Sequence, residues 1–292
     1  MIIVRRSSSN VNKLQRNILT ISTSSSMTSP LPVSASTTTS TCGGGQSQFF
    51  DWAYVLSPEN KLRTTQILSL DRDNCNLNFK NLSNQDNPEY RKAAVLLPLC
   101  FDKNGKPSLL YNLRSLQLTT HRGEISFPGG SLDPEDKGCP IAGAVRETHE
   151  ELGIHPNDIE IWTTLRMFPT IASNMGVIPV LGFVKGIMDP AKLRINPSEV
   201  DHAFTITLEH LCDPKNWEEG VKRKFMGQSY RMPMWKNLNV YSGPGTEEIH
   251  LWGLTAFVTH IALLALLPGD VYERKLPYLN LQLKKLKNSP NL

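Results

Sequence analysis

The order of strand-like and helix-like segments in this 292-residue chain predicts an α/β fold, in which helices pack in layers on a mixed β-sheet. Two observations predict it. A continuous apolar run at residues 93–100 has the composition of a buried strand, and a second strand-like segment follows at 108–114. Helix-like segments at 146–154 and 253–267 alternate with further strand-like segments.

The remaining elements follow in order along the chain. A first helix is expected at 59–70, strands at 159–168 and 177–184, a short helical turn at 208–211, and more strand at 222–234. The late helix at 253–267 is apolar nearly all round, which predicts that it is buried. It is shorter than the roughly twenty residues that a membrane-spanning helix needs.

The first fifty residues differ in composition from the rest and are predicted to be a transit peptide or a disordered leader. They are rich in Ser and Thr and contain no acidic residue before Asp51. A basic, hydroxyl-rich segment without acids resembles an organellar transit peptide, whereas low-complexity composition alone is also typical of disorder. We expect a mitochondrial location. A plastid location stays open, as does a cytosolic form that starts at Met27.

Behind the leader we expect an approach segment at 51–88, a main domain at 89–270 and a C-terminal tail at 271–292. The chain has 31 basic and 27 acidic residues, and four of the basic ones fall in the leader, so the rest is balanced in charge. Balanced charge gives no reason to expect nucleic acid or a membrane as a partner, and we expect a small-molecule substrate. The sequence predicts no oligomeric state.

The five cysteines form no C-x-x-C pair and are expected to be reduced thiols.

An acidic segment at residues 146–154 carries the most specific chemistry. On a helix, Glu147 lies one turn from Glu150 and Glu151, so three carboxylates share one face. Mg²⁺ or Mn²⁺ would relieve their repulsion, because these hard cations prefer oxygen ligands. A solvated acidic helix is the alternative. Residues 127–130, Phe-Pro-Gly-Gly, indicate a tight glycine turn that leads towards this helix.

Together these segments resemble the Nudix box, G-x5-E-x7-R-E-U-x-E-E-x-G-U, where U is aliphatic. The matching residues are Gly130, Arg146, Glu147, Glu150, Glu151, Gly153 and Ile154. Asp136 stands where the box has its first Glu, Thr148 replaces the first aliphatic residue, and two extra residues precede Arg146. The extra residues are expected in the loop around 137–140. The resemblance covers about 93–267 and implies an α/β/α sandwich around a mixed β-sheet, with the carboxylates facing a cleft.

A second motif lies before the box. It resembles the signature of the Nudix coenzyme A diphosphatases, L-L-T-x-R-[SA]-x3-R-x3-G-x3-F-P-G-G. Arg114, Ser115, Gly123 and residues 127–130 match it, while Thr119 stands at the position of the second Arg. Residues 196–201 and 252–255 are also similar to this group, and the mitochondrial members are the most similar.

The resemblance implies metal-dependent hydrolysis of the pyrophosphate of coenzyme A and acyl-coenzyme A, with 3′,5′-ADP and (acyl-)4′-phosphopantetheine as products. Glu150 and Glu151 are the expected ligands of Mg²⁺ or Mn²⁺, and Glu147 is a catalytic base or a further ligand. Arg146 is expected to pair with these carboxylates and hold their rotamers. Glu199 is a further candidate base.

Four residues are expected to bind the substrate. The guanidinium of Arg114 suits the 3′-phosphate of coenzyme A, with a surface position at a strand end as the alternative. Phe127 is a candidate for stacking on adenine, and packing beneath the glycine turn is its alternative. Gly129 and Gly130 let the backbone approach the cation or the phosphates.

Two other functions stay open. The first is a Nudix hydrolase of another nucleotide derivative, such as NADH, ADP-ribose or a capped RNA. The second is a non-catalytic Nudix module that binds a nucleotide. Thr119, Asp136 and the two extra residues keep the second function open, while the intact set of three glutamates favours an enzyme.

Overall fold

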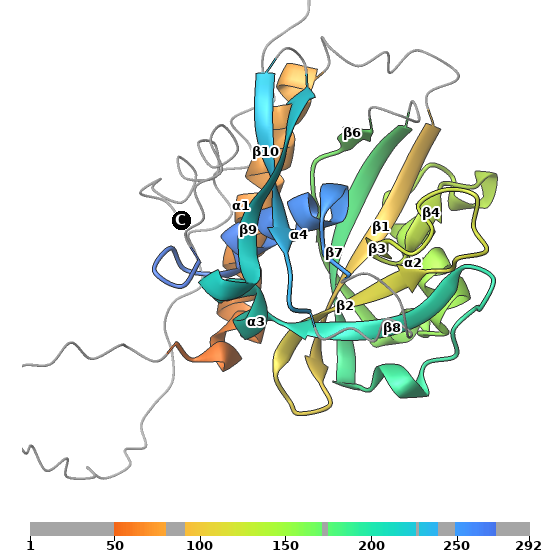
Figure 1. Cartoon of the computed structure of the whole chain (residues 1–292), viewed down its shortest axis with the longest axis horizontal. Helices are drawn as coiled ribbons and strands as arrows, with labels where there is room; N and C mark the ends of the chain where they lie inside the picture. The colour runs from red at the N-terminus through yellow and green to blue at the C-terminus, as the bar shows by residue number, and fades with distance from the viewer. Residues whose placement is uncertain (1–49, 80–90, 171–174, 226–227, 239–248, 273–292) are drawn as a thin grey trace, which may run out of the picture. The chain divides into compact units, whose positions relative to one another are not determined.

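The computed structural model describes residues 50–79, 91–170, 175–225, 228–238 and 249–272. The leader predicted at 1–50 and the tail predicted at 271–292 lie almost entirely outside these ranges, so their assignments stay predictions. The described part contains a mixed β-sheet with helices on both faces, which confirms the predicted α/β class (Figure 1).

The sheet is built around two parallel strands. Its order is β3-β2-β1-β7-β5, and β1 (Arg91–Asp102) runs parallel to β7 (Met175–Met188). On either side of this pair, β2 (Pro107–Arg114) and β5 (Ile159–Thr164) run antiparallel to their neighbours. Strands covered on both faces need apolar residues on both, which explains the continuous apolar runs that mark β1 and β7 in the sequence.

Four shorter or peripheral strands complete the sheet. β3 (Ile125–Ser126) and β8 (Val200–Thr207) pair with β2, β4 (Gly129–Ser131) pairs with β1, and β6 (Phe168–Thr170) pairs with β7. The sequence predicts none of β3, β4 and β8. The first two are too short to show a period, and β8 mixes polar residues among its apolar ones.

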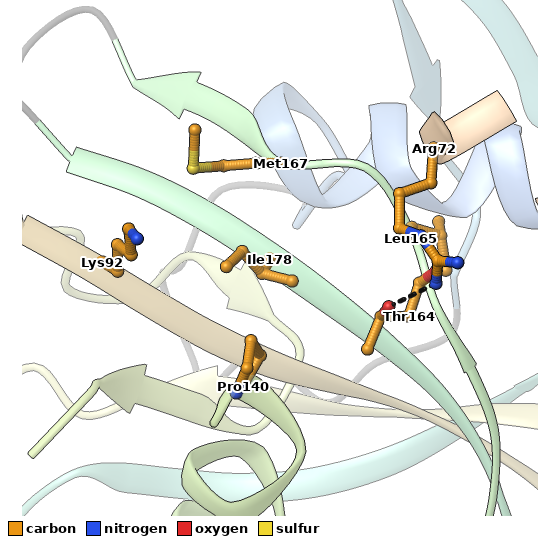
Figure 2. A pocket seen from close by; sticks show the side chains of 7 residues that line it. All are labelled: Arg72, Lys92, Pro140, Thr164, Leu165, Met167 and Ile178. Carbon is orange, nitrogen blue, oxygen red and sulfur yellow. Dashed lines mark hydrogen bonds between the residues drawn. The ribbon is translucent and has the colours of Figure 1, made fainter. Parts of the chain in front are cut away.

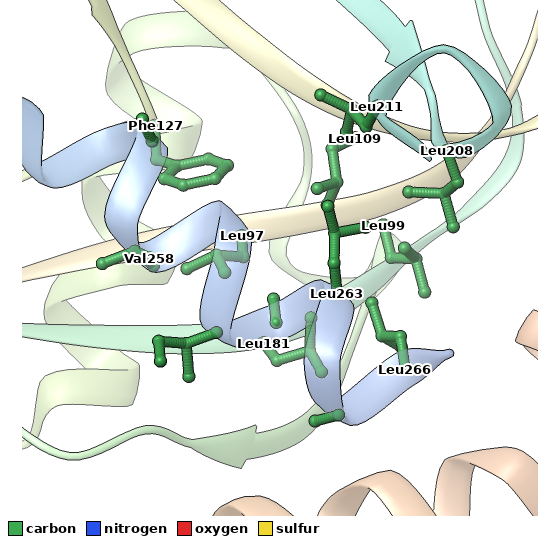
Figure 3. Packing of buried hydrophobic residues seen from close by; sticks show 14 of the residues in the cluster. Leu97, Leu99, Leu109, Phe127, Leu181, Leu208, Leu211, Val258, Leu263 and Leu266 are labelled. Atoms are coloured by element: carbon green, nitrogen blue, oxygen red, sulfur yellow. The ribbon is translucent and has the colours of Figure 1, made fainter. Parts of the chain in front are cut away.

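Helices cover the two faces of the sheet and meet separate apolar clusters. α2 (Pro140–Leu152) packs on one face, where Ala144 and Leu152 join residues of β1 and β7. α1 (Pro58–Phe79) and α4 (Gly253–Leu266) lie on the other face, and Figure 3 shows α4 against the leucines of β1, β2 and β7. Every residue of α4 from Ala256 to Leu266 is buried, as its apolar pattern predicts.

The remaining elements lie beside this core. The short helix α3 (Leu208–Cys212) follows β8, and the hairpin of β9 (Trp217–Phe225) and β10 (Gln228–Trp235) forms a second sheet that packs on α4. A 3₁₀ helix, η1 (Trp52–Leu56), precedes α1. Within the described ranges, no helix combines the length and the apolar character needed to cross a membrane.

Asn60 connects α1 to the core. Its buried side-chain amide donates to the carbonyl oxygens of Val55 and Leu266, each at 3.0 Å. We expect Asn60→Ala to lower the free energy of unfolding by about 2 kcal/mol in urea denaturation, because two buried carbonyls lose their donor. Leu62→Ala, on the same helix at a position 61% exposed, is the control and should change it by less than about 0.5 kcal/mol. A free energy of unfolding that Asn60→Ala leaves unchanged would contradict the role of Asn60 in connecting α1 to the core.

Candidate active site

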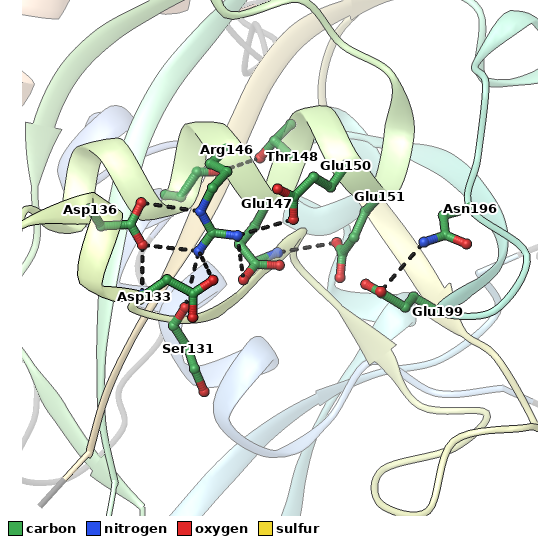
Figure 4. A network of polar contacts seen from close by, with 12 residues as sticks. Ser131, Asp133, Asp136, Arg146, Glu147, Thr148, Glu150, Glu151, Asn196 and Glu199 are labelled. Atoms are coloured by element: carbon green, nitrogen blue, oxygen red, sulfur yellow. Dashed lines mark hydrogen bonds and ion pairs between the residues drawn. The ribbon is translucent and has the colours of Figure 1, made fainter.

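Three carboxylates from two distant parts of the chain meet beside the C-terminal half of α2. Glu147 and Glu151 lie one turn apart on the helix, and Glu199 lies just before β8. One carboxylate oxygen from each lies within 4.8 Å of the other two (Figure 4). Glu151 is buried, while Glu147 and Glu199 are partly buried. Like charges at this separation repel strongly where water is partly excluded, so the trio of Glu147, Glu151 and Glu199 suits a cation.

Backbone hydrogen bonds hold the loop that carries Glu199. The N–H of Asn196 donates to the carbonyl oxygen of Glu151 at 2.9 Å, which ties the loop to the end of α2. The N–H of Ser115 donates to the carbonyl oxygen of Glu199 at 2.9 Å, which ties the same loop to the end of β2. The position of Glu199 is therefore set by both the helix and the sheet.

Glu151 is the most enclosed member of the trio. Its Oε2 accepts hydrogen bonds from the N–H of Gly129 at 3.1 Å and from Nδ2 of Asn112 at 2.9 Å. Burial raises the pKa of its carboxyl group to about 8, although the bond from Gly129 and the charge of Arg114 act in the opposite direction. A proton must therefore leave Glu151 before it binds a cation near neutral pH.

The glycine turn packs directly against Glu147. A Cβ atom at Gly130 would lie 2.5 Å from Oε1 of Glu147, and one at Gly129 would lie 2.4 Å from the carbonyl oxygen of Ala94. Gly129 also has φ of 150°, a conformation that residues with side chains rarely adopt. Burial is the main cause that raises the pKa of Glu147. Gly130 thus leaves room for the carboxylate of Glu147, and Gly129 lets the turn lie close to the backbone of β1.

Arg146 is the cationic partner of four carboxylates. It grips Asp136 with two hydrogen bonds, Nε to Oδ1 at 3.1 Å and Nη2 to Oδ2 at 2.9 Å. It also lies 3.0 Å from Glu150, 3.2 Å from Glu147 and 3.5 Å from Asp133. These hydrogen bonds are the main cause that holds the pKa of Asp136 below its usual range. Asp136 is buried and joins the loop before α2 to the helix.

Glu150 is not a member of the trio, although it shares Nη1 of Arg146 with Glu147. It pairs with Arg146 one turn before it, and its side chain is 51% exposed. Successive residues of an α-helix turn by about 100°, so residues 147 and 151 share one line on the surface and residues 146 and 150 share the next. The structure therefore brings Glu199, rather than Glu150, to the side of Glu147 and Glu151. The role of Glu150 as a metal ligand stays a prediction.

The predicted substrate-binding residues differ in accessibility. Arg114 lies at the end of β2, close enough to the trio for its charge to lower the pKa of Glu151. Its buried Nε has no hydrogen-bond partner among the described residues. Phe127 is only 3% exposed and stacks on Tyr111 with 4.8 Å between ring centroids. The packing alternative is therefore the one that the structure shows for Phe127.

A separate hollow of about 240 Å³ lies between the start of α2, Arg72 of α1, the strands β1 and β7, and the segment at 164–167 (Figure 2). Arg72 and Lys92 are its two charged lining residues, and Arg72 donates to Oγ1 of Thr164 at 2.9 Å. Among the residues that the structure describes, none that lines this hollow carries a carboxylate, so these residues offer no carboxylate ligand to a cation.

Comparison with known proteins finds a matching family model and several named relatives. A family model described as the NUDIX domain matches residues 90–227. The protein named mitochondrial coenzyme A diphosphatase NUDT8 in Homo sapiens is 42% identical over 185 residues, which cover 62% of this chain and 72% of that protein. The protein of the same name in Mus musculus is 40% identical over 61% of this chain and 79% of its own length. Nudix hydrolase 15, mitochondrial, from Arabidopsis thaliana is 32% identical over 57% of this chain and 55% of its own length.

The raised pKa of Glu151 makes cation binding depend on pH. At a pH below its pKa of about 8, the carboxyl group of Glu151 holds a proton that competes with the cation. At a higher pH the carboxylate is free to bind. We expect the affinity for Mn²⁺, measured by calorimetry, to rise with pH between about 6 and 8, by at most about tenfold per pH unit for one released proton. Glu151→Gln should reduce this dependence, and an affinity of the unaltered chain that does not change with pH would contradict the assignment.

Proposed function

We propose that this chain, which belongs to the Nudix hydrolase family, cleaves the pyrophosphate of coenzyme A and of acyl-coenzyme A. The observation that carries the chemistry is the trio of Glu147, Glu151 and Glu199 beside the glycine turn. The choice of substrate rests on the 40–42% identity with relatives named coenzyme A diphosphatases and on the motif that contains Arg114. The products would be 3′,5′-ADP and 4′-phosphopantetheine or its acylated form.

Members of the family act with a divalent metal ion, and we infer that Mg²⁺ or Mn²⁺ serves this chain. The residues fit such an ion, because the trio presents three carboxylates with oxygens within 4.8 Å of one another and no nitrogen or sulfur ligand. When bound, the ion would neutralise charge on the diphosphate and acidify a coordinated water. Glu147, Glu151 and Glu199 would hold it, with Glu150 as the further candidate from the sequence.

Further roles fall to two members of the trio and to two neighbouring arginines. Glu147 and Glu199 are only partly buried, so each is a candidate to take the proton of the attacking water. Arg146 joins α2 to the loop before it through Asp136, and it also pairs with Glu150 on the same helix. Arg114 lies close enough for its charge to act on Glu151, and its Nε has no partner in the described part of the chain, which supports a role in binding a phosphate of the substrate.

A mitochondrial location is supported by two independent observations. The relatives from Homo sapiens, Mus musculus and Arabidopsis thaliana are all named mitochondrial. The first fifty residues have the basic, acid-free composition of a transit peptide. We therefore propose import into mitochondria, for which a fluorescent fusion of residues 1–50 is the direct assay.

Incubation of the purified chain with coenzyme A and Mg²⁺ or Mn²⁺ should release 3′,5′-ADP, detected by liquid chromatography. Glu151→Gln should lower kcat by at least about tenfold, since it removes a carboxylate that would bind the cation. Glu150→Gln is the matched comparison on the neighbouring residue. A smaller loss there would follow from its pairing with Arg146, whereas an equal loss would support Glu150 as a ligand.

The same assay separates the alternatives to this substrate. NADH, ADP-ribose and capped RNA are tested in parallel, and cleavage of one of them without release of 3′,5′-ADP from coenzyme A would reject the proposed substrate. Thermal stabilisation by coenzyme A without any turnover would instead favour a non-catalytic binding module.

Arg114→Ala tests which part of the substrate this side chain binds. If the guanidinium pairs with the 3′-phosphate, the KM for coenzyme A should rise by roughly tenfold, while the KM for dephospho-coenzyme A changes less. The dephospho substrate is the control, because it lacks only that phosphate. An equal rise for both substrates would place the contact of Arg114 on another group.

A further inference from the structure

We propose that Asn112 is a positioning residue, which holds the carboxylate of Glu151 in the orientation that a divalent cation needs. The inference deepens the proposed function of the trio and rests on it. It concerns a residue of β2 that lies 39 positions before Glu151 and outside the run of residues 146–154.

The placement of Asn112 in β2 points its side chain towards α2. Side chains of a strand alternate between the two faces of a sheet. Leu110, two residues before Asn112, packs in the apolar cluster that contains Leu152 of α2. Tyr111 and Leu113, on either side of Asn112, belong to the cluster on the opposite face. Asn112 therefore continues the row of Leu110 towards the carboxylates.

The contact between the two side chains is direct and buried. Nδ2 of Asn112 donates to Oε2 of Glu151 at 2.9 Å, and Asn112 and Glu151 are only 1% and 2% exposed. The N–H of Gly129 donates to the same oxygen, so two donors from different strands meet on Oε2. Two donors on one oxygen fix the plane of the carboxylate and leave Oε1 free of hydrogen bonds from the described residues.

The other half of the Asn112 amide argues against a purely structural role. Its Oδ1 is buried and has no hydrogen-bond partner among the described residues. Burying an unpaired amide oxygen costs free energy, and a leucine of similar size would avoid that cost in a sheet packed against a helix. The hydrogen bond to Glu151 is the one that the amide makes among these residues, so positioning of Glu151 accounts for a polar residue here.

The orientation matters because Glu147 and Glu199 repel Glu151 in its ionised form, which is the form that binds a cation. With the amide removed, Gly129 remains as the single donor, and the carboxylate of Glu151 rotates more freely about its Cγ–Cδ bond. A rotated carboxylate presents its oxygen to the cation less often, so the binding of the cation weakens. Residues that orient metal ligands in this way typically contribute about 10- to 100-fold to metal affinity.

Asn112→Leu tests the inference by titration calorimetry of the full chain with Mn²⁺ and no nucleotide. We expect the Kd for Mn²⁺ to rise by about tenfold or more, with the far-UV circular dichroism unchanged. Ser126→Ala is the matched control, because Ser126 of β3 lies opposite Asn112 in the strand pair and its buried Oγ has no partner among the described residues. Its Kd for Mn²⁺ should stay within about twofold of that of the unaltered chain.

A Kd within twofold of the unaltered chain in folded Asn112→Leu would overturn the inference. If this variant does not fold, Asn112→Ser takes its place, because a serine is small enough to fit and too short to reach Glu151. The double variant with Glu151→Gln should bind Mn²⁺ no more weakly than Glu151→Gln alone, since Asn112 acts through Glu151. A further tenfold loss in the double variant would also overturn it.

The titration separates this inference from the proposed substrate. Mn²⁺ binding needs no coenzyme A, so a chain that binds Mn²⁺ but releases no 3′,5′-ADP would reject the substrate alone. The kcat for coenzyme A should fall in Asn112→Leu at subsaturating Mn²⁺ and recover in part at saturating Mn²⁺, with KM changed by less than about twofold.

Discussion

Electrostatic repulsion among Glu147, Glu151 and Glu199 is the constraint on which the site depends. Carboxylates that lie within 4.8 Å of one another in a partly buried site separate unless the surrounding structure holds them. Here the glycine turn leaves space for Glu147, two donors grip Glu151, and two backbone hydrogen bonds anchor the loop of Glu199. Ionising all three carboxylates in this site is therefore costly, and a divalent cation that binds them offsets that cost.

The fold supplies these restraints from rigid elements. β4, which contains Gly129 and Gly130, pairs antiparallel with β1, and α2 packs on one face of the sheet that they form. β2 brings Asn112 and Arg114 beneath the helix, and pairing of β8 with β2 returns the chain so that Glu199 arrives at the same place. Arg146 then joins α2 to the loop before it through Asp136. Each member of the trio is thus placed by packing and hydrogen bonds that do not involve the cation.

Local spacing explains which parts of the site are visible in the sequence. Glu147, Glu151, Arg146 and the glycine turn fall within a short stretch, where helical period and turn chemistry predict their neighbours. Helical spacing alone also groups Glu150 with Glu147 and Glu151. It does not show that Glu150 forms an ion pair with Arg146, four residues before it. Asn112 and the geometry of Glu199 depend on strand pairing between distant segments, which one sequence does not report. The buried strands and α4 were predictable because their apolar runs are continuous, whereas β8 was not.

The central claim is that Glu147, Glu151 and Glu199 together hold a divalent cation. The most direct measurement is the anomalous scattering of Mn²⁺ in a crystal of this chain grown with MnCl₂. The account predicts an anomalous peak at coordination distance from a carboxylate oxygen of each of these three residues. A bound Mn²⁺ that is coordinated by Glu150 and not by Glu199 would contradict it. The absence of any peak near α2 at millimolar Mn²⁺ would also contradict it.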